Sequence, residues 1–181
     1  MKVAVSRCLL GENCKYSGGN NYDEALCGWL RGHEVIPVCP EVSGGLPIPR
    51  EPCEIVGGTV QTAGGISCDA QYRHGAKVEL EKLKSAGAQL AVLQARSPSC
   101  GCRHIYDGTF SGRLIRGSGI FAQLLHAEGI TAVDTEERDK LENVLAGKWL
   151  LFTAGNERAR KKHDVRISLL ILHRVVSFLQ L

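Results

Sequence analysis

The chain has 181 residues, of which 44% are hydrophobic and 23% are charged, a composition that excludes a disordered or a fibrous protein. Its net charge of +3 is uneven, because residues 156–181 hold six of the 22 basic residues and only two of the 19 acidic ones. The rest of the chain therefore lacks the basic field that indicates nucleic-acid binding. The longest apolar stretch, residues 167–181, is interrupted by His173 and Arg174 and falls short of the ~20 residues of a membrane span. No signal peptide is recognisable in the sequence. We expect a cytoplasmic protein with no membrane partner.

Four runs of branched apolar residues predict β-strands, over Lys2–Val5, His33–Val38, Gln89–Gln94 and Ile130–Val133. Between them, apolar residues at helical spacing predict helices over residues 23–30, 69–86 and 119–128. The prolines and glycines of residues 39–50 indicate a loop. Residues 135–151 again have a helical pattern, and a short basic run, residues 158–162, precedes the apolar C-terminal end.

The alternation of strands and helices predicts the α/β class, with right-handed crossovers between parallel strands. We therefore expect a Rossmann-like, mostly parallel sheet flanked by helices. The pattern changes after Asp134, so we divide the chain into a domain of residues 1–133 and a C-terminal extension of residues 134–181.

Three of the eight cysteines follow predicted strands directly. Cys8 comes after the first strand, Cys39 after the second, and Cys100 follows the third by a short loop. In open α/β sheets, ligands bind beyond the carboxyl ends of the strands. If these strands are neighbours, three thiols converge on one edge, where thiolates suit an iron–sulfur cluster or zinc.

The other cysteines lack this shared position. We interpret Cys27, Cys53 and Cys68 as small core residues, because free cysteine is commonly buried. Either Cys14 or Cys102 could supply a fourth ligand. The spacings Cys8-x5-Cys14 and Cys100-x-Cys102 do not match zinc fingers, nor do they match the cysteine run of bacterial ferredoxins, so a dedicated electron carrier is disfavoured.

The same loops hold polar groups with two possible roles each. Glu41 stands two residues after Cys39, where it can act as a general acid or base beside a cluster or be a solvated loop residue. Ser97 opens the third loop and can act in the site or cap the loop with its hydroxyl. Gly44-Gly45 and the segment 117–119 could allow close approach to a ligand, and the latter also suits an anion at a helix start.

Five motifs in chain order together resemble the small bacterial thiouracil desulfidase family: Ser-Arg-Cys-Leu-Leu-Gly (6–11), Tyr-Ser-Gly-Gly (16–19), Val-Cys-Pro-Glu (38–41) with Gly-Gly-Leu-Pro (44–47) and Pro-Arg (49–50), Ser-Pro-Ser-Cys-Gly (97–101), and Ile-Tyr-Asp-Gly-Thr-Phe-Ser-Gly (105–112). The resemblance covers residues 3–133. Cys53 and Cys102 depart from the family pattern, and nothing after Asp134 matches it.

This resemblance implies an α/β enzyme that holds a 4Fe–4S cluster with three cysteines, by motif match Cys8, Cys39 and Cys100. It implies that Glu41 and Ser97 serve the chemistry, a non-redox removal of sulfur from a thiolated pyrimidine. The fourth iron would be an open Lewis acid with an affinity for soft sulfur. We expect Glu41 to activate a water that attacks C4 of 4-thiouracil, with Ser97 positioning it.

Two other classes of function stay open at this point. The cysteines could form a non-catalytic module that binds metal or senses oxidants. The basic residues 158–162 could contact RNA, since relatives with an added domain act on thiolated tRNA, but charge runs are more often solvated surfaces. We therefore expect a small thiolated pyrimidine as the substrate in preference to tRNA.

Overall fold

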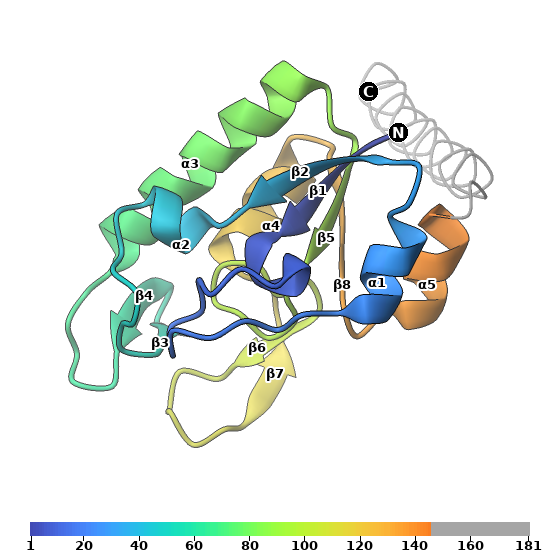
Figure 1. The fold of residues 1–181 in the computed structure, drawn as a ribbon. Coiled ribbons are helices and arrows are strands. Elements are labelled where there is room, and N and C mark those ends of the chain that lie inside the picture. Colours follow the sequence, from blue (N-terminus) through green and yellow to red (C-terminus); the bar gives the residue numbers. More distant parts are fainter. Residues whose placement is uncertain (146–181) are drawn as a thin grey trace, which may run out of the picture. The chain divides into compact units, whose positions relative to one another are not determined.

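The computed structural model describes residues 1–145 and confirms the α/β class (Figure 1). Its main sheet has four parallel strands in the order β2-β1-β5-β8. Their bounds are Lys2–Ser6 for β1, Glu34–Val38 for β2, Leu90–Leu93 for β5 and Thr131–Asp134 for β8. The four predicted strands are thus present, and the first three are neighbours as the cysteine argument requires.

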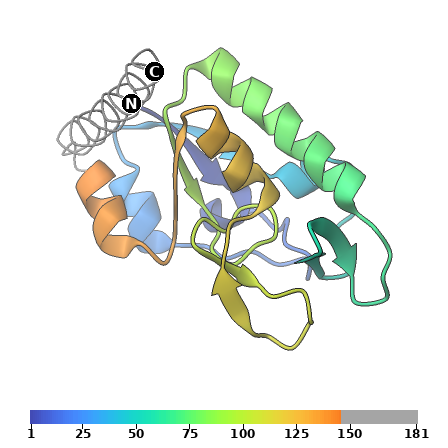
Figure 2. The same ribbon diagram turned by 180° about the vertical axis from the view of Figure 1, so that it is seen from behind.

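The predicted helices are present as well, and they cover both faces of the sheet. They are α1 (Glu24–Trp29), α3 (Asp69–Ala86) and α4 (Ile120–Ala127). Helix α1 lies in front of the sheet in Figure 1 and behind it in Figure 2, whereas α4 lies on the other face. Helices α3 and α4 contact each other, which closes that face.

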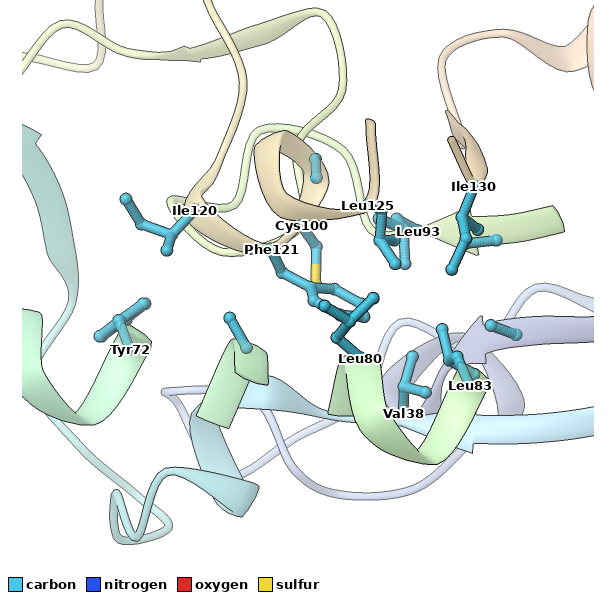
Figure 3. Close-up of a cluster of buried hydrophobic side chains, with 14 of the residues drawn as sticks. Val38, Tyr72, Leu80, Leu83, Leu93, Cys100, Ile120, Phe121, Leu125 and Ile130 are labelled. Carbon is cyan, nitrogen blue, oxygen red and sulfur yellow. The ribbon is translucent and has the colours of Figure 1, made fainter. Parts of the chain in front are cut away.

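The main hydrophobic core fills the space between the sheet and helices α3 and α4 (Figure 3). Alternate strand residues supply one side of it, as period-two side-chain alternation requires. The strand side chains in this core are Ala4, Ile36, Val38, Ala91 and Leu93, and the largest helical ones are Tyr72, Leu80, Leu83, Phe121 and Leu125. Cys100 lies within this cluster, so the core fixes its position.

Several elements differ from the sequence prediction. The expected loop of residues 39–50 contains a short helix, α2 (Pro40–Ser43), which Pro40 begins in the first-turn position that proline favours. Two antiparallel hairpins were not predicted: β3 (Cys53–Val56) with β4 (Thr59–Thr62), and β6 (His104–Tyr106) with β7 (Leu114–Arg116). A 3-10 helix, η1 (Arg7–Leu10), follows β1.

The chain divides into two compact units, Met1–Leu141 and Glu142–Leu181. Of the helix predicted over residues 135–151, the described part contains α5 (Arg138–Asn143). The basic run and the apolar C-terminal end lie outside the described residues. Among residues 1–145, no helix is both long enough and apolar enough to cross a membrane.

Candidate active site

Cys8, Cys39 and Cys100 line one cavity of about 670 Å³ at the carboxyl end of the sheet. Cys8 lies in η1 directly after β1, and Cys39 is the N-cap residue of α2 directly after β2. Cys100 lies in the loop after β5. Because β2, β1 and β5 are adjacent and parallel, their ends bring together three thiols that are far apart in the sequence.

Close packing between α2 and α3 fixes Cys39. A Cβ atom on Gly75 would lie 1.8 Å from the Pro40 carbonyl oxygen, so only glycine lets the two helices approach this far. The buried Glu79 carboxylate then accepts hydrogen bonds from the Cys39 amide (3.0 Å) and the Ser43 hydroxyl (2.6 Å). Its other oxygen lies 3.3 Å from Lys82 Nζ. Glu79 therefore holds the backbone of Cys39 from the core side.

Hydrogen bonds within the loop of residues 97–101 fix Cys100. The Ser97 hydroxyl accepts from the amides of Ser99 (3.0 Å) and Cys100 (3.1 Å). The amides of α4's first turn donate to carbonyls of this loop, with Ile120 N 2.9 Å from Pro98 O. These amides are thus occupied, and the segment 117–119 does not line the cavity, so the expected anion site there is wrong. Gly44 and Gly45 do not line it either.

Glu41 lies in the cavity wall and is held on both carboxylate oxygens. Arg50 donates from Nε to Oε2 (2.8 Å) and also from Nη2, which makes a two-pronged ion pair. Oε1 accepts from the Ser97 hydroxyl at 3.3 Å. The side chains of Arg50 and Glu41 are only 6% and 15% exposed, so water screens the pair weakly. Ser97 thus caps its loop and also contacts Glu41.

The thiols of Cys39 and Cys100 are difficult to ionise by themselves. Hydrogen bonding to Cys14 and burial raise the pKa of the Cys39 thiol. Burial and the nearby Glu41 carboxylate raise the pKa of the Cys100 thiol. A bound cation reverses this effect, because coordination removes the thiol proton.

The surroundings of Cys100 fit a thiolate that binds iron. Ser6 and Ser99 hydroxyls contact its sulfur and act to lower its pKa. The Ser99 hydroxyl is fully buried and has no other hydrogen-bond partner within the described residues. The Ser6 hydroxyl accepts from the Gln94 amide at 3.0 Å, which leaves its own proton to donate. Hydrogen bonds to cysteine sulfurs tune iron–sulfur clusters, so both hydroxyls suit a cluster ligand.

Cys8, Cys39 and Cys100 line one cavity. Each cysteine ligand of a 4Fe–4S cluster binds a different iron, so such ligands stand around a shared space. Within residues 1–145, no group of three His, Cys, Asp or Glu side chains forms a site for a single metal ion.

The two cysteines considered as a fourth ligand lie in different places. Cys14 lines the cavity and contacts the thiols of Cys39 and Cys8. Cys102 does not line the cavity; its sulfur is 3.5 Å from the Cys100 carbonyl and its amide donates to Asp134 (2.8 Å). Cys53, interpreted above as a core residue, belongs to the core cluster and also reaches the cavity wall.

Aromatic side chains also line the cavity: Tyr16, Tyr72, Tyr106 and Phe110. The buried Glu54 carboxylate accepts hydrogen bonds from the amides of Gly108 (2.9 Å) and Phe110 (3.1 Å). Glu54 therefore ties the tip of the β6–β7 hairpin to the wall of the cavity. Flat aromatic surfaces of this kind suit stacking against a planar base.

Two contributors to this site were not identified from the sequence. Arg50 was part of a motif, but no spacing rule joins it to Glu41 nine residues earlier. Glu79 had a detectable signal, because it stands four residues after Gly75 and seven after Tyr72, on the buried face of α3. A charged residue on an apolar helix face generally has a specific partner.

Comparisons with known proteins bear on the family of this chain. The family model described as 2-thiouracil desulfurase matches residues 3–137. The protein YbbK of Bacillus subtilis (strain 168) is 37% identical over 145 residues, which cover 75% of this chain and 96% of YbbK. A solved structure, the [4Fe-4S]-dependent thiouracil desulfidase TudS, is 35% identical with a TM-score of 0.74 and covers 80% of this chain and 97% of its own. The chain is therefore a member of the 2-thiouracil desulfurase family.

Proposed function

We propose that this protein removes sulfur from a thiolated pyrimidine by a hydrolytic, non-redox reaction that uses a 4Fe–4S cluster. The observation that carries the proposal is the convergence of three strand-end thiols with the Glu41–Ser97 pair on one cavity. Cys8, Cys39 and Cys100 would hold the cluster. Family membership and the similarity to TudS support both the cofactor and the substrate class.

The cluster, when bound, supplies an iron with an open position that attracts soft sulfur and polarises the carbon–sulfur bond. The protein's own residues do the rest. Glu41 Oε1 takes a proton from a water as the water oxygen attacks C4 of 4-thiouracil. The carbon–sulfur bond then breaks, the Glu41 proton goes to the leaving sulfur, and the hydroxyl now on C4 gives up its proton to the sulfur as the carbonyl forms. The products are uracil and hydrogen sulfide, so no electron is gained or lost.

Hydrogen bonds from Arg50 and Ser97 orient Glu41 for the role of general base. Arg50 occupies Oε2 and leaves Oε1 directed toward Ser97. The two loop amides occupy the acceptor positions of the Ser97 hydroxyl, so its single proton is directed at Glu41 Oε1 and can turn to the attacking water. A site whose donors and acceptors are already aligned loses little free energy to reorganisation.

The proposal also divides the chain into a part that carries the reaction and a part that does not. We propose that residues 1–133 hold the chemistry and that residues 134–181 form an extension that the reaction does not need. The substrate we favour is a free thiolated base in the cytoplasm, in preference to thiolated tRNA. The aromatic wall and the cavity of about 670 Å³ suit a small planar molecule.

Anaerobic turnover tests this function. The reconstituted protein is incubated separately with 4-thiouracil and 2-thiouracil, without any electron donor, while uracil and sulfide are quantified. We expect equal amounts of uracil and sulfide from at least one of the two bases. Turnover that requires an added reductant, or a brown protein that converts neither base, would contradict the proposal.

A further inference from the structure

A fourth thiol stands beside the three that would hold the cluster. Cys14 lies in the segment between η1 and α1, is 1% exposed and lines the same cavity. Its thiol contacts those of both Cys39 and Cys8. Any iron bound to either residue would therefore lie near the Cys14 sulfur.

Cys14 does not have the surroundings of an ordinary core cysteine. It is buried, but it does not belong to the main hydrophobic core cluster, and its side-chain partners are thiols. Its backbone is fixed at the site, because the carbonyl accepts from Arg50 Nη2 at 3.0 Å. The same Arg50 group donates to Glu41, so Arg50 connects the backbone of Cys14 to the proposed catalytic carboxylate.

We propose that Cys14 is a displaceable fourth ligand, which occupies the open iron of the resting cluster and leaves it when substrate sulfur arrives. The inference rests on the proposed function. When Cys14 binds, its S–H bond breaks, a sulfur–iron bond forms and the proton goes to water. When the thiolated base binds, that bond breaks and a proton from water restores the thiol. Both steps exchange ligands, and neither transfers electrons.

This arrangement protects the cluster between turnovers. An iron without a cysteine ligand is the one most easily lost on oxidation, and Cys14 would hold it in the absence of substrate. A role for Cys14 as the acceptor of the removed sulfur is disfavoured. Forming a persulfide from a thiol and sulfide releases two electrons, and the reaction provides no oxidant.

Controlled oxidation with ferricyanide tests the proposal. One-electron oxidation of a 4Fe–4S cluster in the 2+ state gives the 3+ state, which releases Fe²⁺ and leaves a 3Fe–4S cluster in the 1+ state. The variants are Cys14→Ala and the volume-conserving Cys14→Val, with Cys27→Ala as the matched control because Cys27 does not line the cavity. Electron paramagnetic resonance follows the 3Fe–4S signal, and iron is counted before and after oxidation.

We expect all four proteins to bind the cluster, with both Cys14 variants losing one iron of four under conditions where wild type and Cys27→Ala retain it. Both Cys14 variants should also have a lower KM for the thiolated base, because no internal ligand competes with it. Equal iron loss in all four proteins would overturn the role of Cys14 alone. Two folded Cys14 variants without any cluster would also overturn it, since Cys14 would then be an obligatory ligand. A wild type that binds no cluster would overturn the proposed function as well.

Discussion

The cysteines at the carboxyl end of the sheet differ from the remaining ones in position, not in chemistry. Cys100 and Cys102 are two residues apart, and burial raises the pKa of both thiols. Of these two, Cys100 lines the cavity, together with Cys8, Cys14, Cys39 and Cys53. Cys102 does not line it, and its sulfur lies 3.5 Å from the Cys100 carbonyl oxygen. Burial and pKa therefore do not distinguish the proposed ligand Cys100 from Cys102. Their positions relative to the cavity do.

The largest expected effect is a loss of bound iron when a cysteine proposed as a ligand is replaced, and no loss when a cysteine outside the cavity is replaced. Cys8→Ala and Cys39→Ala should each lower iron from about four per chain to near zero, because a cluster with three fixed ligands cannot lose one. Cys68→Ala, outside the cavity, should leave iron unchanged. Anaerobic reconstitution followed by iron and acid-labile sulfide analysis measures this. Full iron in both cavity variants would refute the ligand assignment.

Within the cavity, Glu41→Gln should separate cluster binding from catalysis. Glutamine keeps the size of the side chain but cannot accept the proton of the attacking water. We expect normal iron content and a kcat lower by ~10²–10⁴, the usual contribution of a general base. A kcat equal to wild type at full iron content would remove Glu41 from the role of base.

A smaller effect is expected at Arg50, which acts through Glu41. Arg50→Lys keeps the positive charge but loses the two-pronged geometry. We expect kcat to fall roughly 10–100-fold, as for other residues that orient a ligand or catalytic group, with KM and iron content unchanged. Arg73→Lys changes an exposed ion pair with Asp69 and serves as the control. A parallel loss of iron and kcat would instead indicate a structural role.

The smallest effect is expected from removing residues 156–181. The family model ends at residue 137, and every residue that lines the proposed cavity precedes residue 113. Iron content and turnover of the thiolated base should therefore stay within experimental error of the full chain. If the folded, truncated protein lost its cluster, the proposed division of the chain would be wrong.

The parallel sheet was predictable because its strands are short, apolar and separated by helical patterns. The hairpin of Cys53–Val56 and Thr59–Thr62 was not, because its residues pair with each other and bury only part of one face, so the alternation is weak. Helix α2 was hidden by the prolines and glycines around it, although Pro40 is a favourable first residue.

The site was predictable where position along a strand determines it. Cys8, Cys39 and Cys100 follow from the rule for strand ends, and the cavity contains all three. The partners of Arg50 and Glu79 were not predictable, although the place of Glu79 on a buried helix face was a signal. Side-chain hydrogen bonds join these residues to Glu41 and Cys39, which stand nine and forty residues away. No local pattern encodes such contacts. The sequence also did not show that Cys14 lines the cavity and that Cys102 does not, because the geometry of the loops decides this.

The most direct test compares Cys100→Ala with Cys102→Ala in a single iron determination after anaerobic reconstitution. The two positions share a loop, a buried environment and a raised thiol pKa, and they differ in whether they line the cavity. We predict near-zero iron in Cys100→Ala and about four iron per chain in Cys102→Ala. The opposite result, iron retained without Cys100 and lost without Cys102, would contradict the assignment of the cluster to this cavity.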